Sequence, residues 1–370
     1  MGQAPSGDAY NHEGKGWPLI AGAGDFGETY PVCKKYTAEA ARLSKYGDIV
    51  LGIRASIGEK VIADGEYCLG RGVAGLRGKS NLDSRYLWHW LTHTGPVLAS
   101  KAKGATFKQV NKDDIGELEI ILPALPEQRR IAAILDQADA LRAKRREALA
   151  QLDSLTQSIF IEMFGDPSTN SKNWDVVRLS DEVSIQGGFA FKSSDYVSSG
   201  IPLIRIGDVN RSSGANENQC FLPKYWAEKY SRFLIHPGSL LMSLTGTTGK
   251  DDYGNVVVLS NHFCEYFLNQ RVACIKPIGD RISKAFLHSF LKDKKVKSLI
   301  VSKSRGVRQA NISNGDILEL SLPVPPLKLQ VKYSECIDQL ESLKFQHKNS
   351  SSELNTLFAS LQHRAFRGEL

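Results

Sequence analysis

The chain has 370 residues, and 47 Lys and Arg against 40 Asp and Glu give it a formal net charge of +7. Hydrophobic residues make up 42% and charged residues 24%, which is typical of a soluble globular protein and excludes a disordered chain, a collagen and a small disulfide scaffold. No apolar run reaches the roughly 18 residues of a membrane span. The length suggests two or three domains.

The N-terminal residues and the cysteines point to a cytoplasmic protein. The first residues, MGQAPSGDAYNHEGKG, lack the apolar centre of a signal peptide. The six cysteines are scattered without a CxxC pair, which favours reduced thiols in a cytosol over a structural zinc site. The histidines show no metal-ligand spacing, so we expect no bound metal.

Short strands and helices are expected in two globular parts. Apolar runs that follow turn residues, and alternating apolar residues, predict strands at 48–53, 118–122, 238–244 and 318–322. Apolar residues at helical spacing predict helices at 86–98 and 284–301. The aromatic residues of these helices are expected in the core rather than stacked on bases, namely Trp88, Trp90, Phe286 and Phe290.

Two long helices are predicted at 127–163 and 329–365, each after a proline. Apolar residues in both recur at alternating spacings of four and three, which is typical of a coiled-coil seam. The expected seam residues are Ile134, Leu141, Leu152, Leu155, Leu340, Leu343, Leu354 and Leu357. Each pattern has one polar interruption, Arg145 and His347. We expect the two helices to pair antiparallel; the alternatives are two independent helical hairpins or an oligomerising tail.

The globular parts repeat each other in the same order. GWPLI at 16–20 returns as GIPLI at 200–204, and LGRGVA at 69–74 returns as LNQRVA at 268–273. We align QVN at 109–111 with QAN at 309–311 and the Leu-Pro before each long helix at an offset of 200; the helices align at 202. The prediction is an α+β protein with two mixed domains, each followed by a long helix.

The expected boundaries are 1–122 for the first domain, 123–165 for its helix, 166–322 for the second domain and 323–370 for its helix. The second copy begins with Trp174-Asp175-Val176-Val177-Arg178-Leu179, for which the first copy has no equivalent. Either the start of the first domain is mis-set, or that domain is truncated at its N-terminus.

These residues resemble the specificity subunit of type I restriction–modification systems over essentially the whole chain. The similarity lies in the segments 122–167 and 322–370 and in the fragments MGQAPSGDAYN, GATFKQVN and GDIVL. The resemblance implies that each globular part is a target-recognition domain that reads one half of a split DNA sequence. It also implies that the helices set the spacing and dock two methyltransferase subunits, that restriction subunits join, and that the chain has no catalytic residues. No cofactor is expected on this chain; S-adenosylmethionine is expected on the methyltransferase.

Base edges are read by Arg or Lys at guanine and by Asn or Gln at adenine. The candidate DNA-binding residues of the first copy are Arg54, Lys60, Lys103, Lys108 and Gln109. Those of the second are Arg205, Arg211, Lys250, Lys303, Arg305, Arg308 and Gln309. The second copy also carries a basic run at 292–308, which is either a phosphate-binding surface or a solvated helix face.

Two other function classes stay open. A fused methyltransferase or nuclease would need an amino-methyltransferase motif or a carboxylate–lysine centre, which we do not find, and Gly246–Asp251 only mimics a phosphate-binding loop. A coiled-coil adaptor that binds proteins without specific DNA binding is the alternative, and salt-dependent retention on DNA would discriminate it.

Overall fold

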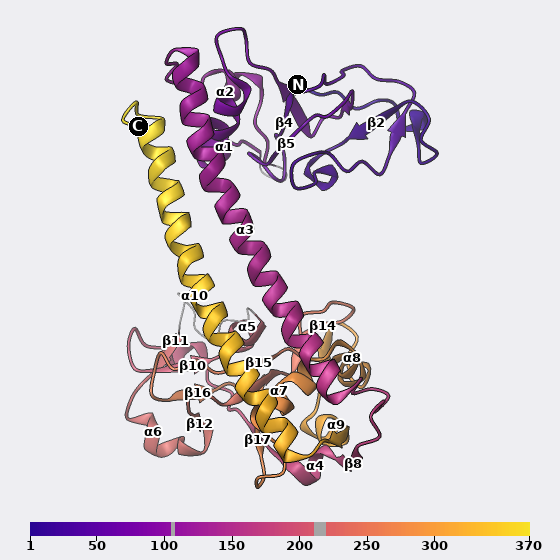
Figure 1. The fold of residues 1–370 in the computed structure, drawn as a ribbon, viewed down its shortest axis with the longest axis vertical. Coiled ribbons are helices and arrows are strands. Elements are labelled where there is room, and N and C mark those ends of the chain that lie inside the picture. The colour runs from indigo at the N-terminus through magenta and orange to yellow at the C-terminus, as the bar shows by residue number, and fades with distance from the viewer. Residues whose placement is uncertain (105–107, 211–219) are drawn as a thin grey trace. The chain divides into compact units, whose positions relative to one another are not determined.

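The chain divides into two compact units. The computed structural model describes residues 1–104, 108–210 and 220–370. The first unit comprises 1–147 and 347–370, and the second comprises 148–346. Each unit therefore contains a mixed α/β part and a portion of both long helices, α3 (Leu125–Phe164) and α10 (Leu327–Ala365) (Figure 1). None of the described helices is long and apolar enough to cross a membrane.

Among its described residues, the first unit has two small sheets and two α-helices besides its portions of α3 and α10. One sheet has the order β1-β3-β2-β6 and the other the order β5-β4-β7. The strands are β1 (Tyr10–Asn11), β2 (Trp17–Ile20), β3 (Tyr36–Thr37), β4 (Ile49–Gly52), β5 (Lys60–Ile62), β6 (Cys68–Leu69) and β7 (Val73–Leu76). The helices are α1 (Ser84–Ser100) and α2 (Lys112–Gly116).

The second unit repeats this plan with additional strands. Its larger sheets have the orders β11-β10-β16-β12 and β15-β13-β17-β9, and β14-β18 and β19-β8 form two-stranded sheets. The strands are β8 (Asp175–Arg178), β9 (Val183–Gly187), β10 (Ile201–Ile204), β11 (Cys220–Leu222), β12 (Leu234–Ile235), β13 (Leu240–Ser243), β14 (Thr245–Thr247), β15 (Val256–Val258), β16 (Tyr266–Leu268), β17 (Val272–Pro277), β18 (Gln309–Asn311) and β19 (Ser321–Val324). The helices are α4 (Leu179–Glu182), α5 (Ile206–Asn210), α6 (Trp226–Lys229), α7 (Lys284–Lys292), α8 (Lys294–Ser302) and α9 (Asn314–Leu318).

Most of the predicted short elements are present. The strands expected at 48–53 and 238–244 are β4 and β13, and the helix expected at 86–98 is α1. The helix expected at 284–301 is divided, because the carboxylate of Asp293 accepts hydrogen bonds from the backbone of Lys295 and Val296 and so begins a new helix. The predicted core aromatics Trp90, Phe286 and Phe290 are buried. The fourth, Trp88, is partly buried against the same core as Trp90.

Two strand predictions need correction. The strand expected at 318–322 begins only at Ser321, because Leu318 ends α9. The segment 118–122 is not a strand, so that prediction is wrong. In the second unit the corresponding strand, β19, pairs with β8, and no strand among the described residues of the first unit lies beside 118–122. Alternating apolar residues without a neighbouring strand do not form a ladder.

Each long helix is fixed at its start by one buried glutamine. In the second unit, the side-chain amide of Gln330 donates to the carbonyls of Pro325 (2.8 Å) and Arg281 (3.1 Å). Its oxygen accepts from the backbone N–H of Ser283 at 2.8 Å, at the start of α7. Gln330 is fully buried and so connects the loop before α10 to the helix that packs beside it.

Gln128 makes the same three bonds in the first unit. Its amide donates to Pro123 (2.8 Å) and Asn81 (2.9 Å), and its oxygen accepts from the N–H of Asp83 at 2.8 Å. Gln128 is also fully buried. The segments 123–128 and 325–330 are therefore equivalent helix starts, 202 residues apart, and they share the proline carbonyl and the glutamine five residues after it.

This equivalence corrects the repeat alignment near the helices. Pro123 corresponds to Pro325 and not to Pro323, because these two carbonyls accept from the equivalent glutamines. Likewise Asn111, which caps α2, corresponds to Ser313, which caps α9. The offset is therefore already 202 at the end of the globular parts. The short QVN and QAN match at offset 200 was misleading because it contains only three residues.

The two long helices pair antiparallel, as predicted. In the first unit, Arg142 donates to Asn355 at 2.7 Å, and Arg145 lies 3.0 Å from the ring nitrogen of His347. In the second unit, the ammonium of Lys344 contacts Asp153 and Thr156, both at 3.0 Å. Residue numbers rise along α3 as they fall along α10 in both units, because in the second unit Phe160 packs against Tyr333 beyond the Lys344 contacts. The fold is α+β with an antiparallel helix pair.

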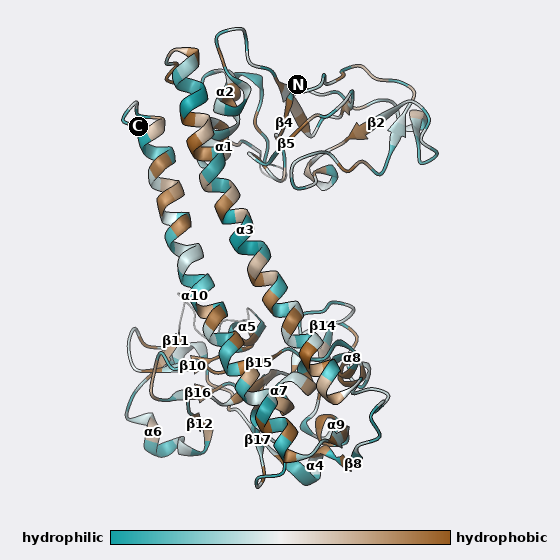
Figure 2. Ribbon diagram, viewed as in Figure 1, coloured by the Kyte–Doolittle hydropathy of each residue, from teal (hydrophilic) through white to brown (hydrophobic). Residues whose placement is uncertain are grey.

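The predicted seam residues are only partly correct. Leu141, Leu155, Leu343 and Leu357 are 53%, 44%, 40% and 51% exposed, so they do not lie in a buried seam. The other four predicted seam residues are half-buried, namely Ile134, Leu152, Leu340 and Leu354. The helix faces that are buried carry Leu135, Tyr333, Phe358 and the alkyl chain of Lys344. On α10, most of the buried positions hold aromatic or polar residues, which a pattern that counts aliphatic residues misses. Figure 2 shows hydrophobic residues dispersed along both helices rather than in one stripe.

Candidate nucleic-acid interface

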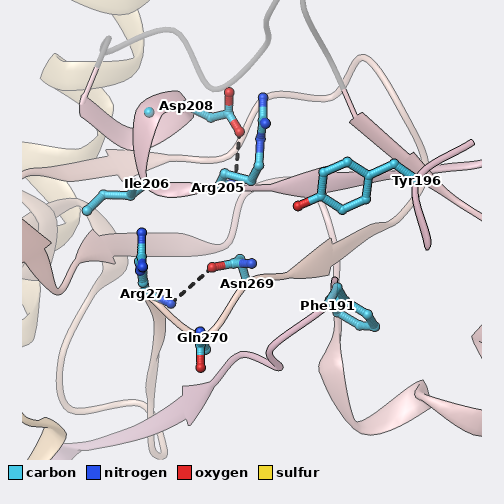
Figure 3. A pocket seen from close by; sticks show the side chains of 9 residues that line it. Phe191, Tyr196, Arg205, Ile206, Asp208, Asn269, Gln270 and Arg271 are labelled. Carbon is cyan, nitrogen blue, oxygen red and sulfur yellow. Dashed lines mark hydrogen bonds between the residues drawn. The ribbon is translucent and has the colours of Figure 1, made fainter. Parts of the chain in front are cut away.

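The second unit contains a polar cleft of about 470 Å³. It is lined by Phe191, Tyr196, Arg205, Ile206, Gly207, Asp208, Asn269, Gln270 and Arg271. Figure 3 shows that Asn269, Gln270 and Arg271 lie together on one turn, with Arg205 on a separate segment beside it. Arginine and amide side chains are the groups that read guanine and adenine edges. We refer to this site as the cleft.

Parallel strands bring the two segments of the cleft together. β10 and β16 pair in parallel, with Ile204 opposite Leu268. The residues that follow the two strands, Arg205 and Asn269, therefore emerge at the same edge of the sheet, where ligands of open sheets commonly bind. The N–H of Asn269 donates to the carbonyl of Ile204 at 3.1 Å, and this bond holds the ends of the two strands next to each other.

Local hydrogen bonds hold both segments of the cleft. The carboxylate of Asp208, which is buried, accepts from the N–H of Arg205 at 2.7 Å (Figure 3). The side-chain oxygen of Asn269 accepts from the N–H of Arg271 at 3.3 Å. Both bonds use backbone donors, so they fix the path of the two segments that carry Arg205 and Arg271.

The first unit has the same frame without these side chains. β2 and β6 pair in parallel, and the N–H of Gly70 donates to the carbonyl of Ile20 at 2.9 Å, as Asn269 does to Ile204. Ala21 stands where Arg205 stands, and its N–H donates to Asp25 at 2.8 Å. The turn reads Gly70-Arg71-Gly72 in place of Asn269-Gln270-Arg271. Except for an arginine in the turn, the polar side chains that line the cleft therefore have no equivalents at these positions of the first unit.

Of the cleft residues, the sequence-based prediction contained Arg205 but missed Asn269, Gln270 and Arg271. The signal that could have found them is the pair LGRGVA and LNQRVA, which aligns throughout except at the turn. A position where two copies of one frame differ in polar side chains is a candidate for a difference in ligand.

A β-hairpin in the second unit carries several predicted residues. The backbones of Arg305 and Asn311 exchange hydrogen bonds at 3.0 and 2.9 Å, and we refer to residues 305–311 as the hairpin. Arg308 and Gln309 are exposed on it, and Val307 at its tip is 94% exposed. In the first unit Lys103 and Gln109 exchange two bonds of 3.0 Å in the same way, and Lys108 is exposed beside them.

Acidic neighbours compensate much of the basic run at 292–308. Lys303 pairs with Glu319 at 3.1 Å, and Arg305 pairs with Asp316 at 3.4 Å. Two further lysines are also paired, Lys295 with Asp166 and Lys297 with Asp251. The Lys295 ammonium lowers the pKa of Asp166 to about 2. Charge counting along the sequence missed these acids because they lie up to 129 residues away.

The remaining predicted residues do not gather at one place. Lys60 donates to the hydroxyl of Thr92 at 2.7 Å and lies 4.5 Å from the centre of the Trp88 ring, and burial lowers its pKa to about 8. It therefore packs against α1. Arg54 is half-buried, and its Nε has no hydrogen-bond partner among the described residues. Lys250 is exposed just after the turn that follows β14, so the phosphate-loop mimic consists of the end of a strand and a turn. Arg211 lies outside the described residues.

The chain matches the family model described as "Type I restriction modification DNA specificity domain" over residues 8–151 and 171–356. The chain belongs to this family. Both copies of the repeat fall within the match, in agreement with the resemblance noted from the sequence. Among the described residues, no group of three or more His, Cys, Asp or Glu side chains could hold a metal ion.

Curated relatives include a putative type I restriction enzyme MjaX specificity subunit of Methanocaldococcus jannaschii, which is 34% identical over 160 residues, covering 43% of this chain and 38% of the relative. The MjaVIII specificity subunit of the same organism is 26% identical, covering 71% of this chain and 64% of the relative. The Escherichia coli EcoBI specificity subunit is 21% identical, covering 78% and 66%. The chain thus spans between about two-fifths and two-thirds of these relatives' lengths.

A solved S subunit of a type I restriction–modification system from M. genitalium has the same fold. It matches with a TM-score of 0.53 and 18% identity, covering 99% of this chain and 92% of that one. A second structure, from a study of complex assembly and conformational transition of the type I R-M system, matches with a TM-score of 0.56 and 19% identity, covering 96% and 92%. At this identity the likeness concerns the fold alone.

Proposed function

We propose that this chain recognises a DNA sequence for a type I restriction–modification complex. The observation that carries the proposal is the cleft, which two arginines and two amide side chains line in a member of a DNA specificity family. A bidentate arginine reads guanine, and Asn or Gln reads adenine. Cleft residues of the second unit read base edges, and the exposed residues of the hairpin contact phosphates and fix the register.

Each unit reads one half of a split double-stranded DNA target. Both long helices contribute to both units, so they act as the spacer between the half-sites. Helix α3 has 40 residues, which at 1.5 Å per residue correspond to roughly 60 Å. Half-sites on one face of DNA are separated by about 34 Å or multiples of it. A helix of this length is sufficient for such a separation.

The chain acts as a non-catalytic subunit in the cytoplasm. Leucines that are exposed on the two helices, Leu141, Leu155, Leu343 and Leu357, offer apolar positions for docking two methyltransferase subunits. The methyltransferase supplies S-adenosylmethionine, and restriction subunits join the assembly through it. This chain binds no cofactor or metal of its own in the proposal.

The experiment is a DNA titration of the chain together with its methyltransferase partner, combined with methylation mapping in cells. The triple variant K303A/R305A/R308A should bind all sequences more weakly, and its salt slope should fall by about 0.9 for each phosphate that is no longer neutralised. Because Lys303 and Arg305 have acidic partners, we expect the weakening to come mainly from Arg308. The matched control is K328A, on the exposed first turn of α10. Salt-independent binding, or methylation without a shared sequence, would support the adaptor alternative.

A further inference from the structure

The tip of the hairpin in the second unit exposes a valine. Val307 is 94% exposed, more than any other large hydrophobic side chain among the described residues. A single exposed valine is ordinary on a protein surface and by itself indicates no function. Val307 differs from other such residues in how its backbone is held and in the charges beside it.

The backbone that carries Val307 is held in a tight turn. Arg305 and Asn311 exchange two backbone hydrogen bonds at the base of the tip. Gly306 has a φ of 122°, and a Cβ there would lie 2.0 Å from the backbone oxygen of Gln309. Only glycine allows the chain to turn back this closely. The tip is therefore compact.

A second turn supports the hairpin from the other side. β14 pairs with β18, which forms one side of the hairpin. In the turn that follows β14, the hydroxyl of Thr248 donates to the carbonyl of Gly306 at 3.2 Å. The N–H of Thr248 donates to the carbonyl of Arg308 at 3.4 Å. Both residues next to Val307 are thus bonded to this neighbouring turn, so the valine stands on a supported loop.

Cationic side chains flank the tip. Arg308 follows Val307 directly, is exposed, and forms no ion pair with an acid among the described residues. Lys250, just after the neighbouring turn, is also exposed. Arg305 pairs with Asp316, but its side chain is 82% exposed. An apolar tip between cations matches duplex DNA, whose anionic phosphates lie outside and whose stacked bases lie inside.

We propose that Val307 inserts between two adjacent base pairs of the half-site that the second unit reads, while Arg308 and Lys250 contact the flanking phosphates. This rests on the proposed function, because it needs DNA bound to the second unit. Apolar side chains that insert in this way unstack one base step and kink the duplex. A rigid tip suits this role, because a loop that must be ordered on binding loses affinity.

The inserted valine contributes to sequence preference without a hydrogen bond to a base. Unstacking costs least at flexible pyrimidine–purine steps, so such a step is preferred where Val307 inserts. The tip therefore reads deformability, and the cleft reads base edges. Both act within the second unit.

The test uses the full chain with its methyltransferase partner and the target found by methylation mapping. The fluorescent base 2-aminopurine, which brightens when it is unstacked, is placed at one position at a time in and beside this half-site. The wild-type complex should brighten at one base step. Val307→Ser should abolish the brightening and weaken binding by about tenfold, because the buried methyl groups are lost. Its salt slope should not change, since no phosphate contact is lost.

Two variants provide matched controls. Val32→Ser replaces a valine that is 60% exposed in the first unit and should leave the brightening and the affinity unchanged. Val307→Leu keeps an apolar tip and should keep the brightening. Because Val307 is exposed, Val307→Ser should unfold at the same urea concentration as the wild type. If the wild type binds its target specifically and Val307→Ser binds and unstacks it equally well, this proposal alone is overturned.

Two further outcomes separate the alternatives. If the wild-type complex prefers no DNA sequence, the proposed function fails, and the insertion of Val307 fails with it. If Val307→Ser weakens the binding of the methyltransferase partner when no DNA is present, the tip docks on a protein, and the proposal is wrong.

Discussion

The turns that follow β6 and β16 occupy equivalent places and differ in what they can bind. The second unit has Asn269-Gln270-Arg271 there, and the first has Gly70-Arg71-Gly72. The glycines are required by the backbone: a Cβ on Gly72 would lie 2.3 Å from the oxygen of Ala21, and one on Gly70 would lie 2.9 Å from its Cα. The polar turn cannot be transplanted into the first unit without moving its backbone. The two units therefore differ in the side chains that this turn presents.

What the two units share is the machinery that starts the helices and joins them. The buried glutamines at the helix starts make the same three bonds. Arg142 in the first unit and Lys344 in the second are 202 residues apart, and each joins α3 to α10. The two units therefore repeat the same helix starts and helix pairing, and they differ in the turn at the edge of the sheet, after β6 in one and after β16 in the other. The following predictions test both parts of this statement.

The largest effect is expected from the helix-start glutamines. Gln330→Ala should lower the free energy of unfolding by about 2–4 kcal/mol, because it leaves two carbonyls and one N–H without their partner in a buried place. Gln128→Ala should cost a similar amount. Urea denaturation of both variants measures this. K328A, exposed on the same helix turn, should stay within about 0.5 kcal/mol. A large difference between the two glutamine variants would break the equivalence of the frames.

Acid should destabilise the second unit more than the first. Burial lowers the pKa of His288 on α7 to about 4. The pKa of His89 on α1 is also lowered by burial, but its hydrogen bond to Asp136 at 2.7 Å acts in the opposite direction. In the unfolded chain a histidine has a pKa of about 6.5 and binds a proton below it. The free energy of unfolding therefore falls as the pH drops from about 6.5 towards 4. Amide hydrogen exchange of α7 and α1 at about pH 6.5 and about pH 4, corrected for the intrinsic exchange rates, measures this loss of stability. Equal loosening of both helices would contradict the expectation.

In the proposed DNA complex, the cleft should give a position-specific effect. Arg271→Ala should relax the preference at one base pair by about 1–3 kcal/mol and leave the other half-site unchanged. Arg71→Ala, on the equivalent turn of the first unit, should not alter the preference of the half-site that the second unit reads. Binding to a library of single-base variants, with the methyltransferase present, separates these outcomes. Uniform weakening at all positions by Arg271→Ala would place this arginine on a phosphate.

Much of the fold could be predicted from the sequence, because it depends on local signals. The repeat, α1, β4 and β13, the helix starts and the antiparallel pairing follow from apolar spacing, turn residues and prolines. The strand expected at 118–122 failed because a strand needs a partner, which single-segment periodicity does not report. Of the cleft, only Arg205 was predicted from the sequence. The repeat could have marked the turn at 269–271 as variable, but only the parallel pairing of β10 and β16 shows that this turn lies beside Arg205. The acids that pair with the basic run were not predicted for the same reason: the fold brings them close from other parts of the sequence.

The smallest effects concern the helix faces, where exposure decides which leucines matter. Leu152→Ala should cost about 1–2 kcal/mol, less than the roughly 2–5 kcal/mol of a fully packed leucine, because this residue is half-buried. Leu141→Ala should stay within about 0.5 kcal/mol, because the side chain is 53% exposed. Urea denaturation of the isolated chain compares the two. If Leu141 instead forms part of the proposed docking surface, its variant should bind the methyltransferase subunit more weakly at unchanged stability. Equal losses of stability for the two variants would instead support the seam that was predicted from the residue spacing, in which both leucines are buried.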